Sequence, residues 1–236
     1  MDSTKITIII PTFNEVDNIP SLLERISNLH LDIKVLFIDD NSPDGTAELI
    51  NKLKSQYSFI ELLSKPTKEG LGAAYKTGFA HALKQGADIV GEMDADLSHQ
   101  PEDLPTLIKA SADGAQVVIG SRRIAGGKIV GWSAFRRLES IAATIIARLL
   151  LGLKTRDITS GFRLYDKQAL EKIPWTTVTT SGYAWQEELL YYAEKLKLDI
   201  VEVPITFTDR QRGVSKLSIN DIIEFFSTIL RLKFRR

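Results

Sequence analysis

The chain has 236 residues, of which 44% are hydrophobic, so it is long enough to bury the core of one domain. Thirty basic and thirty acidic residues cancel, which gives no sign of nucleic-acid binding, and the absence of cysteine excludes disulfides and thiolate metal sites. The first residues lack the features of a signal peptide, and no apolar run reaches the roughly 18 residues needed to span a bilayer. We therefore expect a soluble chain with a basic tail, RLKFRR.

Short β-branched segments alternate with longer amphipathic ones along the first half of the chain. Strands are expected at 6–10, 34–38, 59–63, 87–93 and 116–121, and helices at 17–29, 42–56, 70–85 and from Pro101. Ser42 and Pro43 are typical of the N-cap and first turn of the 42–56 helix. Nearly continuous apolar strands between helices predict a nucleotide-type α/β unit with a mostly parallel sheet covered on both faces.

The alternation breaks after residue 121. A glycine-rich basic loop at 122–132 is followed by an unusually apolar helix at 138–153, a helix near 185–197, a strand at 200–207, a polar loop at 209–218 and a final helix. We interpret this second part as an elaboration that completes a site. In open parallel sheets ligands bind beyond the carboxyl ends of the strands, so polar clusters there are the candidates for function.

Three acids, Glu92, Asp94 and Asp96, follow the apolar stretch ADIV within five residues. If the extended backbone persists, Asp94 and Asp96 project to the same side, and with a neutral oxygen from Ser98 they suit a hard divalent cation such as Mg²⁺. The alternative is that Asp96 or Ser98 caps the helix at Pro101 while the remaining acids are solvated. Both interpretations stay open on this segment alone.

Two further polar clusters end the first two strands. In PTFNE (11–15), Glu15 is placed to meet a ribose or base, although a residue there commonly caps the next helix. In IDDNSPDGT (38–46), one of the adjacent acids Asp39 and Asp40 can serve as a cap, but a cap does not need two.

Basic residues that can meet phosphates lie in separate segments. Each alone is typical of a solvated surface, but together with a metal site they indicate a diphosphate and a second anion. They are Arg122, Arg123, Arg136, Arg137, Arg210, Arg212 and Lys216.

The remaining candidates have structural interpretations. The aromatic residues of GYAWQEELLYYA (182–193) indicate packing rather than a sugar platform, and Gln186, Glu187 and Glu188 are ordinary in the first turn of a helix. The three histidines, His30, His81 and His99, have no spacing typical of a metal site or a catalytic triad, so they are assigned no role.

The order of the segments PTFNE, IDDNSPDGT, GLGAAYKTGF, MDADLSHQPE, IGSR, DITSGFRLY and EVPITFTDRQRGVSKLS resembles family 2 glycosyltransferases. More narrowly, residues from about 5 to 230 resemble the catalytic domains of dolichyl-phosphate (polyprenyl-phosphate) mannose synthases. The resemblance implies a GT-A fold and a metal-dependent transfer of mannose from GDP-mannose to a dolichyl or polyprenyl phosphate, with inversion at the anomeric carbon. It also implies a catalytic domain at 1–217, with a nucleotide-binding half at about 1–121 and an acceptor half at 122–217, followed by a basic amphipathic helix at 218–236.

The resemblance assigns roles by position. Asp94 and Asp96 match the metal-binding DxD motif for Mg²⁺ or Mn²⁺, with Ser98 as a third candidate ligand, and Arg136 and Ser140 match positions near the acceptor phosphate. Residues matching the family's nucleotide-sugar-binding positions are Pro11, Phe13, Glu15, Ile38, Asp39, Asp40, Asp94, Ala95, Asp96, Arg122, Arg210 and Lys216; among them, Asp94, Asp96, Arg122, Arg210 and Lys216 are the candidate catalytic residues.

A lipid acceptor would explain why the 138–153 helix and the final helix are so apolar. The 138–153 helix follows two arginines, and the final helix combines an apolar face with four basic residues, a pattern typical of a membrane surface. We expect a peripheral protein on the cytoplasmic face of a membrane, with small membrane-anchoring subunits as candidate partners. The alternative is that both helices pack on the sheet or on each other.

Two other functions stay open at this point. One is a polyprenyl-phosphate glucosyltransferase, or another hexosyltransferase, that uses a UDP-sugar. The other is a non-catalytic nucleotide-sugar-binding subunit. A nicotinamide-dependent dehydrogenase is disfavoured, because no GxGxxG follows the first strand.

Overall fold

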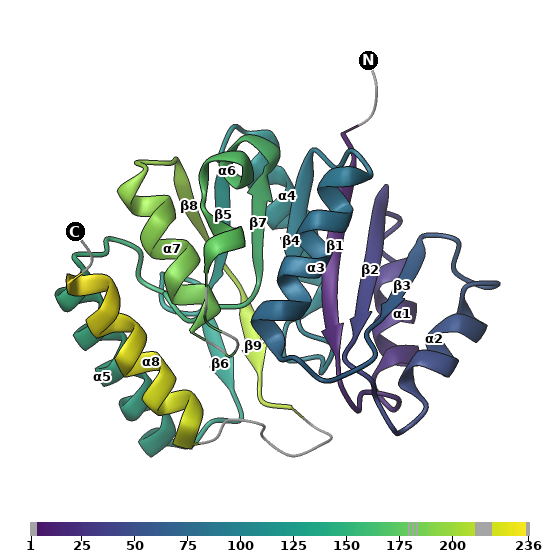
Figure 1. The fold of residues 1–236 in the computed structure, drawn as a ribbon, viewed down its shortest axis with the longest axis horizontal. Helices are drawn as coiled ribbons and strands as arrows, with labels where there is room; N and C mark the ends of the chain where they lie inside the picture. Colours follow the sequence, from purple (N-terminus) through teal and green to yellow (C-terminus); the bar gives the residue numbers. More distant parts are fainter. Residues whose placement is uncertain (1–3, 179, 181, 183, 211–218, 235–236) are drawn as a thin grey trace.

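A seven-stranded sheet runs through the middle of the molecule in the order β3-β2-β1-β4-β7-β5-β8 (Figure 1). The structure is a computed structural model that describes residues 4–178, 180, 182, 184–210 and 219–234. The strands of the sheet are β1 (Ile6–Thr12), β2 (Ile33–Asp39), β3 (Ile60–Ser64), β4 (Ile89–Glu92), β5 (Val117–Ser121), β7 (Arg163–Asp166) and β8 (Ile200–Pro204). Every neighbouring pair is parallel except those of β7, which runs antiparallel to β4 and β5. The predicted mostly parallel sheet is confirmed.

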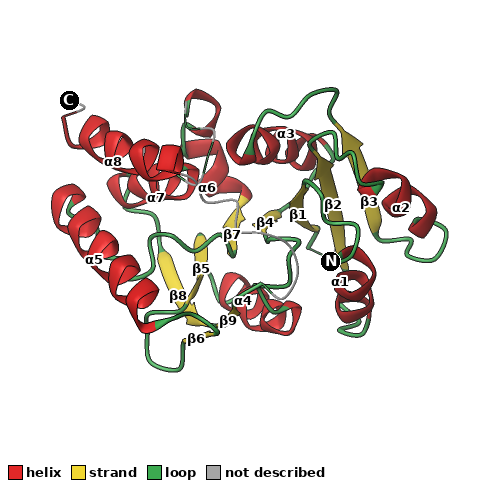
Figure 2. Ribbon diagram, turned by 90° about the horizontal axis from the view of Figure 1, so that it is seen from below, coloured by secondary structure: helices red, strands yellow, loops and turns green. Residues whose placement is uncertain are grey.

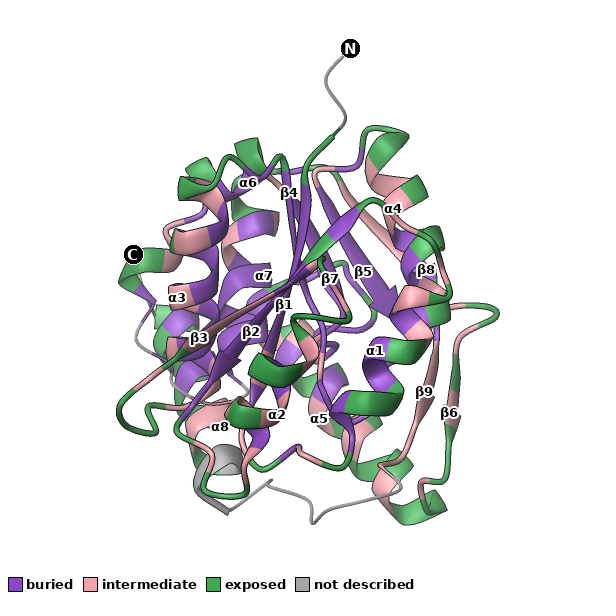
Figure 3. Ribbon diagram, turned by 90° about the vertical axis from the view of Figure 1, so that its right-hand side faces the viewer, coloured by how far each residue is buried: buried purple, intermediate pink, exposed green. Residues whose placement is uncertain are grey.

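Helices cover both faces of this sheet (Figure 2). One face packs against α3 (Leu71–Lys84), α6 (Lys167–Lys172) and α7 (Trp185–Lys195), and the other against α1 (Ile19–Ser27), α2 (Thr46–Leu53) and α4 (Leu104–Ala112). The strands are largely buried while the outward sides of the helices are exposed, so two apolar layers form on either side of the sheet (Figure 3). Two short 3-10 helices, Pro101–Asp103 and Trp175–Thr177, complete this part of the chain.

Two helices lie side by side at one end of the molecule, outside the layer that contains α7 (Figure 1). They are α5 (Ala134–Leu151) and α8 (Ile219–Phe234). Ala147 and Leu151 of α5 and Ile229 and Leu232 of α8 are buried in the core, so each helix is anchored along one side. No helix among the described residues is both long and apolar enough to cross a membrane.

The outer side of these two helices is unusually apolar. We call it the α5–α8 face. Its large exposed apolar side chains are Phe135, Leu138, Ile141, Ile145, Ile146 and Leu149 of α5, and Ile223, Phe226, Leu230 and Phe234 of α8. The predicted alternative, that both helices pack on the sheet or on each other, describes only their inner sides.

Several predicted boundaries are wrong, for local reasons. The helix expected at 42–56 begins at Thr46, and its N-cap is Gly45 (φ 88°) rather than Ser42, whose hydroxyl instead donates to Asp39. The strand expected at 200–207 divides into β8 and β9 (Thr206–Thr208), and β9 pairs with β6 (Lys128–Val130) in a second, two-stranded sheet. The helix expected at 138–153 begins at Ala134, so Arg136 lies within its first turn.

Candidate active site

The carboxyl ends of the parallel strands lie at the lower edge of the sheet in Figure 1, and β7 begins at the same edge because it runs in the opposite direction. Segments after β1, β2, β4 and β5 and before β7 therefore meet there. The segments that carry the predicted site residues therefore lie at the edge where an open parallel sheet binds its ligands.

The acidic pair lies in a turn directly after β4. The strand ends at Glu92, so the condition under which Asp94 and Asp96 would project to the same side of a strand is not met. Instead, Leu97 has a φ of 61° and the backbone N–H of Ser98 donates to Oδ1 of Asp96 at 3.0 Å. Gln100 and Asp103 occupy the N-cap positions of the following helices, so the alternative in which Asp96 or Ser98 is the N-cap is also wrong.

The two carboxylates are crowded. Burial among protein atoms, together with the charges of Asp96 and Glu15, raises the pKa of Asp94 to about 7, while Arg210 and Arg122 oppose the shift. Arg210 Nη2 lies 3.2 Å from Oδ2 of Asp96. A divalent cation would relieve the repulsion between the acids, so these residues fit such an ion.

The acids do not form a closed metal cage. Among the residues that the structure describes, no group of three or more histidine or carboxylate side chains is arranged around a common centre. Two carboxylates leave coordination positions for water and for phosphate oxygens, which is the usual way that Mg²⁺ is held beside a nucleotide. Ser98 Oγ is buried and has no hydrogen-bond partner among the described residues, and its role as a ligand remains a prediction.

His99, to which the sequence analysis assigned no role, is a buried hydrogen-bond acceptor for the backbone of the acidic turn. Its Nδ1 accepts a hydrogen bond from the backbone N–H of Asp94 at 3.2 Å, and its ring stacks on Phe162 and meets Phe207 edge-on. Burial lowers the pKa of His99 to about 4. The imidazole is therefore neutral at pH 7, and it holds the turn through a hydrogen bond rather than through charge.

Arg122 follows β5 and is held by Asp157 from the segment before β7. Its Nε and Nη2 donate to the two oxygens of Asp157 at 2.8 and 2.7 Å, and Nη2 also donates to Thr159 Oγ1 at 2.7 Å. The Arg122 guanidinium keeps the pKa of the buried Asp157 carboxyl below its ordinary value. This bidentate pairing fixes the orientation of Arg122 before any ligand arrives.

Two more arginines lie beside it. Arg123 Nη2 donates to Ser140 Oγ at 2.7 Å, and its buried Nε has no hydrogen-bond partner among the described residues. Arg136 pairs with Asp209 at 3.0 Å, and its guanidinium lies 4.3 Å from the ring centre of Trp132. Arg122 lies 6.0 Å from the centre of the same Trp132 ring, so the candidate acceptor-phosphate residue Arg136 is near Arg122, while Ser140 contacts the adjacent Arg123.

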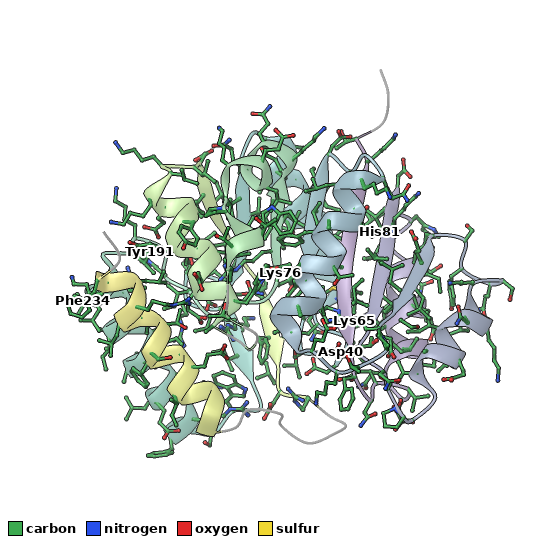
Figure 4. All side chains as sticks on the ribbon, in the orientation of Figure 1. Asp40, Lys65, Lys76, His81, Tyr191 and Phe234 are labelled. Carbon is green, nitrogen blue, oxygen red and sulfur yellow. The ribbon has the colours of Figure 1, made fainter. Side chains whose placement is uncertain are left out.

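The two acids at the end of β2, Asp39 and Asp40, accept hydrogen bonds from other parts of the protein. Asp39 accepts from the Thr12 and Ser42 hydroxyls, at 2.9 and 2.6 Å. Asp40 accepts from the backbone N–H groups of Glu69 and Gly70, and its Oδ1 lies 3.5 Å from Lys65 Nζ. Figure 4 labels both residues. Neither acid caps α2.

The other candidate nucleotide residues differ in their exposure. Ile38 is fully buried and Ala95 nearly so, while Phe13 is half-buried beneath Lys68, whose Nζ is 3.7 Å from the ring centre. Glu15 is buried and accepts from Asn18 Nδ2 at 2.7 Å. Pro11 is half-buried, between the buried residues Ile10 and Thr12 of β1. Lys216 lies outside the described residues, and the nucleotide-binding roles of all these residues remain predictions.

A buried polar cluster under the site was missed by the sequence analysis. Arg163 is fully buried and donates to the carbonyl oxygens of Ser160, Ile158 and Gln186 at 2.7 Å each. Glu92, which comes before the acidic pair, accepts from Trp185 Nε1 at 2.8 Å, and burial raises its pKa to about 7.

The first-turn residues of α7 belong to the same cluster. Gln186, Glu187 and Glu188 lie in the first turn of α7 as predicted, but all three are buried, which ordinary first-turn residues are not. Burial raises the pKa of Glu187 to about 8, with Arg163 and Arg122 opposing the shift. The only signal in the sequence is their place directly after an aromatic segment, which does not distinguish a buried helix start from an exposed one.

Comparison with known proteins agrees with this architecture. The family model described as "Glycosyl transferase family 2" matches residues 7–174. An undecaprenyl-phosphate mannosyltransferase from Micrococcus luteus is 42% identical over 214 residues, which are 91% of this chain and 88% of that protein. A polyprenol monophosphomannose synthase from Mycolicibacterium smegmatis is 41% identical over 218 residues, 92% of this chain and 82% of that protein.

Solved structures of glucosyl-3-phosphoglycerate synthase from Mycobacterium tuberculosis have the same fold. One of them, in complex with Mn²⁺, UDP-glucose and phosphoglyceric acid, matches with a TM-score of 0.70 and 22% identity, over 98% of this chain and 80% of that chain. Another, in complex with Mn²⁺, UDP and phosphoglyceric acid, has a TM-score of 0.71 and 20% identity, over 99% and 80%. The predicted GT-A type of fold is confirmed.

Proposed function

This chain belongs to glycosyl transferase family 2, and on that premise we propose that it transfers mannose from GDP-mannose to the phosphate of a polyprenyl phosphate. It is a glycosyltransferase, and the relatives named as polyprenol-phosphate and undecaprenyl-phosphate mannosyltransferases support this acceptor and this sugar. One observation carries the proposal: an acidic pair and several arginines meet at one edge of the sheet, beside the apolar α5–α8 face.

The acidic pair supports the donor side of the reaction. Asp94 and Asp96 would hold a divalent cation, Mg²⁺ or Mn²⁺, and a structural relative was solved with Mn²⁺ and a nucleotide sugar. When bound, the cation neutralises charge that develops on the leaving diphosphate. Arg122 and Arg210 lie close enough to Asp94 to lower its pKa, which supports a role in which they would contact the same diphosphate.

The arginines near α5 support the acceptor side. A phosphate monoester has a second pKa of about 6, so its oxygen is already a nucleophile at pH 7 and needs no strong general base. In the proposed reaction that oxygen bonds to the anomeric carbon, and the bond from this carbon to the diphosphate oxygen breaks with its electron pair. Arg123 and Arg136 would reduce the repulsion between the two anions.

The place of Arg136 on α5 connects the site with the lipid. Its neighbours Phe135 and Leu138 are 70% and 65% exposed, so an apolar surface begins next to the proposed phosphate position. Since polyprenyl tails reside in membranes, we infer that the α5–α8 face rests on the bilayer surface while the phosphate reaches Arg136. A peripheral position on the cytoplasmic side and small membrane-anchoring partner subunits belong to the same proposal.

A donor screen tests the function. Purified protein is incubated with MnCl₂, undecaprenyl phosphate and either labelled GDP-mannose or labelled UDP-glucose, and label is counted in the organic phase. We expect label from GDP-mannose, and at least about 100-fold less with Asp96→Asn protein that melts at the same temperature. Label from UDP-glucose alone would replace mannose with the glucosyl alternative, and no label from either donor would refute lipid-phosphate glycosylation.

A further inference from the structure

The Gln186 side chain is a buried polar group that has no function in the site as described so far. Gln186 is 3% exposed, and neither its Nε2 nor its Oε1 has a partner with the geometry of a hydrogen bond among the described residues, although the side chain is near enough to Glu92 to lower the pKa of that carboxyl. Buried polar groups are nearly always paired, because an unpaired group loses its hydrogen bonds to water without replacement. A carboxamide with both ends unpaired therefore indicates that something else binds there.

The surroundings of Gly161, which has no side chain, show that the Gln186 carboxamide lies near Asp94. A Cβ atom placed on Gly161 would lie 3.7 Å from Gln186 Nε2, 3.7 Å from Asp94 Oδ1 and 3.6 Å from His99 Cε1. The backbone of Gly161 does not have the positive φ that favours glycine, so its conformation does not call for this residue. The Gln186 amide and the Asp94 carboxylate thus border one small space that a side chain at residue 161 would narrow.

The backbone around Gln186 is held firmly. Arg163 Nη1 donates to the Gln186 carbonyl oxygen at 2.7 Å, and the preceding Trp185 donates through Nε1 to Glu92 at 2.8 Å. Both partners are fully buried in the sheet. The start of α7 is therefore fixed relative to the acidic turn after β4, and the carboxamide needs little reorganisation to bind a ligand.

The chemistry of this space favours an uncharged polyol over a phosphate. A carboxamide offers two donors and an acceptor, which matches a hydroxyl group that both donates and accepts. The Asp94 and Glu92 carboxyls on this side would repel an anion. The nearby cation, Arg163, already donates to three backbone carbonyl oxygens. In a nucleotide sugar the uncharged polyol is the sugar itself. It is bonded to the diphosphate, so it would lie next to the acids that hold the metal-bound diphosphate.

We propose that Gln186 binds a hydroxyl group of the donor sugar, in the space beside Asp94 and Gly161, and that it helps to select the sugar. The proposal rests on the proposed function, because it assumes a nucleotide-sugar donor at the acidic turn. It assigns to Gln186 a part in binding the sugar and none in binding the nucleoside diphosphate.

Paired titrations of GDP and GDP-mannose, with MnCl₂ present, test this assignment by calorimetry. Gln186→Met keeps the volume of the side chain and removes both polar ends, and Gln186→Ala is a second variant if the first does not fold. We expect the affinity for GDP-mannose to fall about 10-fold or more, while the affinity for GDP changes by less than about 2-fold. Gln168→Ala, at an exposed residue of α6, is the control and should change neither.

The outcomes separate the two proposals. An equal loss for GDP and GDP-mannose, or no loss for either, would overturn the role of Gln186 while leaving the proposed function intact. If the wild-type protein binds UDP-glucose and not GDP-mannose, the proposed donor is wrong. The role of Gln186 is then tested by comparing the affinities of the same variants for UDP and UDP-glucose. Should the wild-type protein bind neither nucleotide sugar, both proposals are wrong.

Discussion

The ion pair between α8 and α7 should contribute measurably to the stability of the protein. Arg231 Nη2 lies 2.6 Å from Oε2 of Glu188, which is fully buried, while the Arg231 side chain is 40% exposed. A hydrogen bond to a charged group contributes about 1.5–3 kcal/mol, and the exposure of Arg231 reduces this to about 1–2 kcal/mol. For a chain of this size, Arg231→Met should therefore lower the melting temperature by about 2–8 °C.

A double-mutant cycle measures the pair itself. Arg231→Met, Glu188→Gln and the double variant are unfolded in urea, and the free energies of unfolding are compared with wild type. We expect the double variant to lose less stability than the sum of the single losses, because the two substitutions remove the same contact. Lys233→Met, at an exposed basic residue on the same helix, is the control and should have little effect. Additive losses, within about 0.5 kcal/mol, would refute the reasoning.

Four further predictions follow from the site and from the surface. Asp96→Asn should reduce transfer at least about 100-fold at unchanged melting temperature, because one carboxylate holds the cation poorly; activity near wild type in the lipid assay would contradict this. Gly161→Ala should fold normally, since its methyl would make only ordinary contacts, but should raise the KM for the donor; an unchanged KM would show that the space is not used. Between pH 4.5 and about 8 the folded Glu187 carboxyl keeps its proton while the unfolded chain releases it, so the stability of wild type should fall relative to Glu187→Gln by at most about 1.4 kcal/mol per pH unit; parallel urea midpoints at pH 5 and pH 8 would argue against it. Replacing Phe135 and Leu138 by serine should weaken flotation with liposomes that contain anionic lipid, whereas Leu196→Ser, at an exposed leucine outside the α5–α8 face, should not; equal flotation of all three proteins would remove α5 from the membrane contact.

The strands and the position of the site could be predicted from the sequence because both depend on local patterns. Apolar runs of five to seven residues followed by polar clusters mark buried parallel strands and their carboxyl ends, and β1, β2 and β5 are found where they are expected. Asp94 and Asp96 were identified for the same reason, although the turn that holds them was not. Their place after an apolar strand was sufficient.

The remaining site residues depend on contacts between segments that are distant in sequence. Asp157 binds Arg122 across 35 residues, and nothing in DITSGFRLY indicates that β7 runs antiparallel and brings this acid to the edge of the sheet. His99 and Gln186 were missed because a histidine in a turn and a glutamine at a helix start are usually exposed. Their burial results from packing between β4, β7 and α7, which the local sequence does not specify.

The apolar α5–α8 face also has a consequence for kinetics under the proposed function. A protein that rests on the bilayer meets its lipid acceptor by lateral diffusion in two dimensions, while GDP-mannose arrives from the water. The rate should then follow the mole fraction of acceptor in the membrane rather than its amount per volume of solution. Diluting the acceptor with inert phospholipid, at constant total acceptor, would slow the reaction by surface dilution alone.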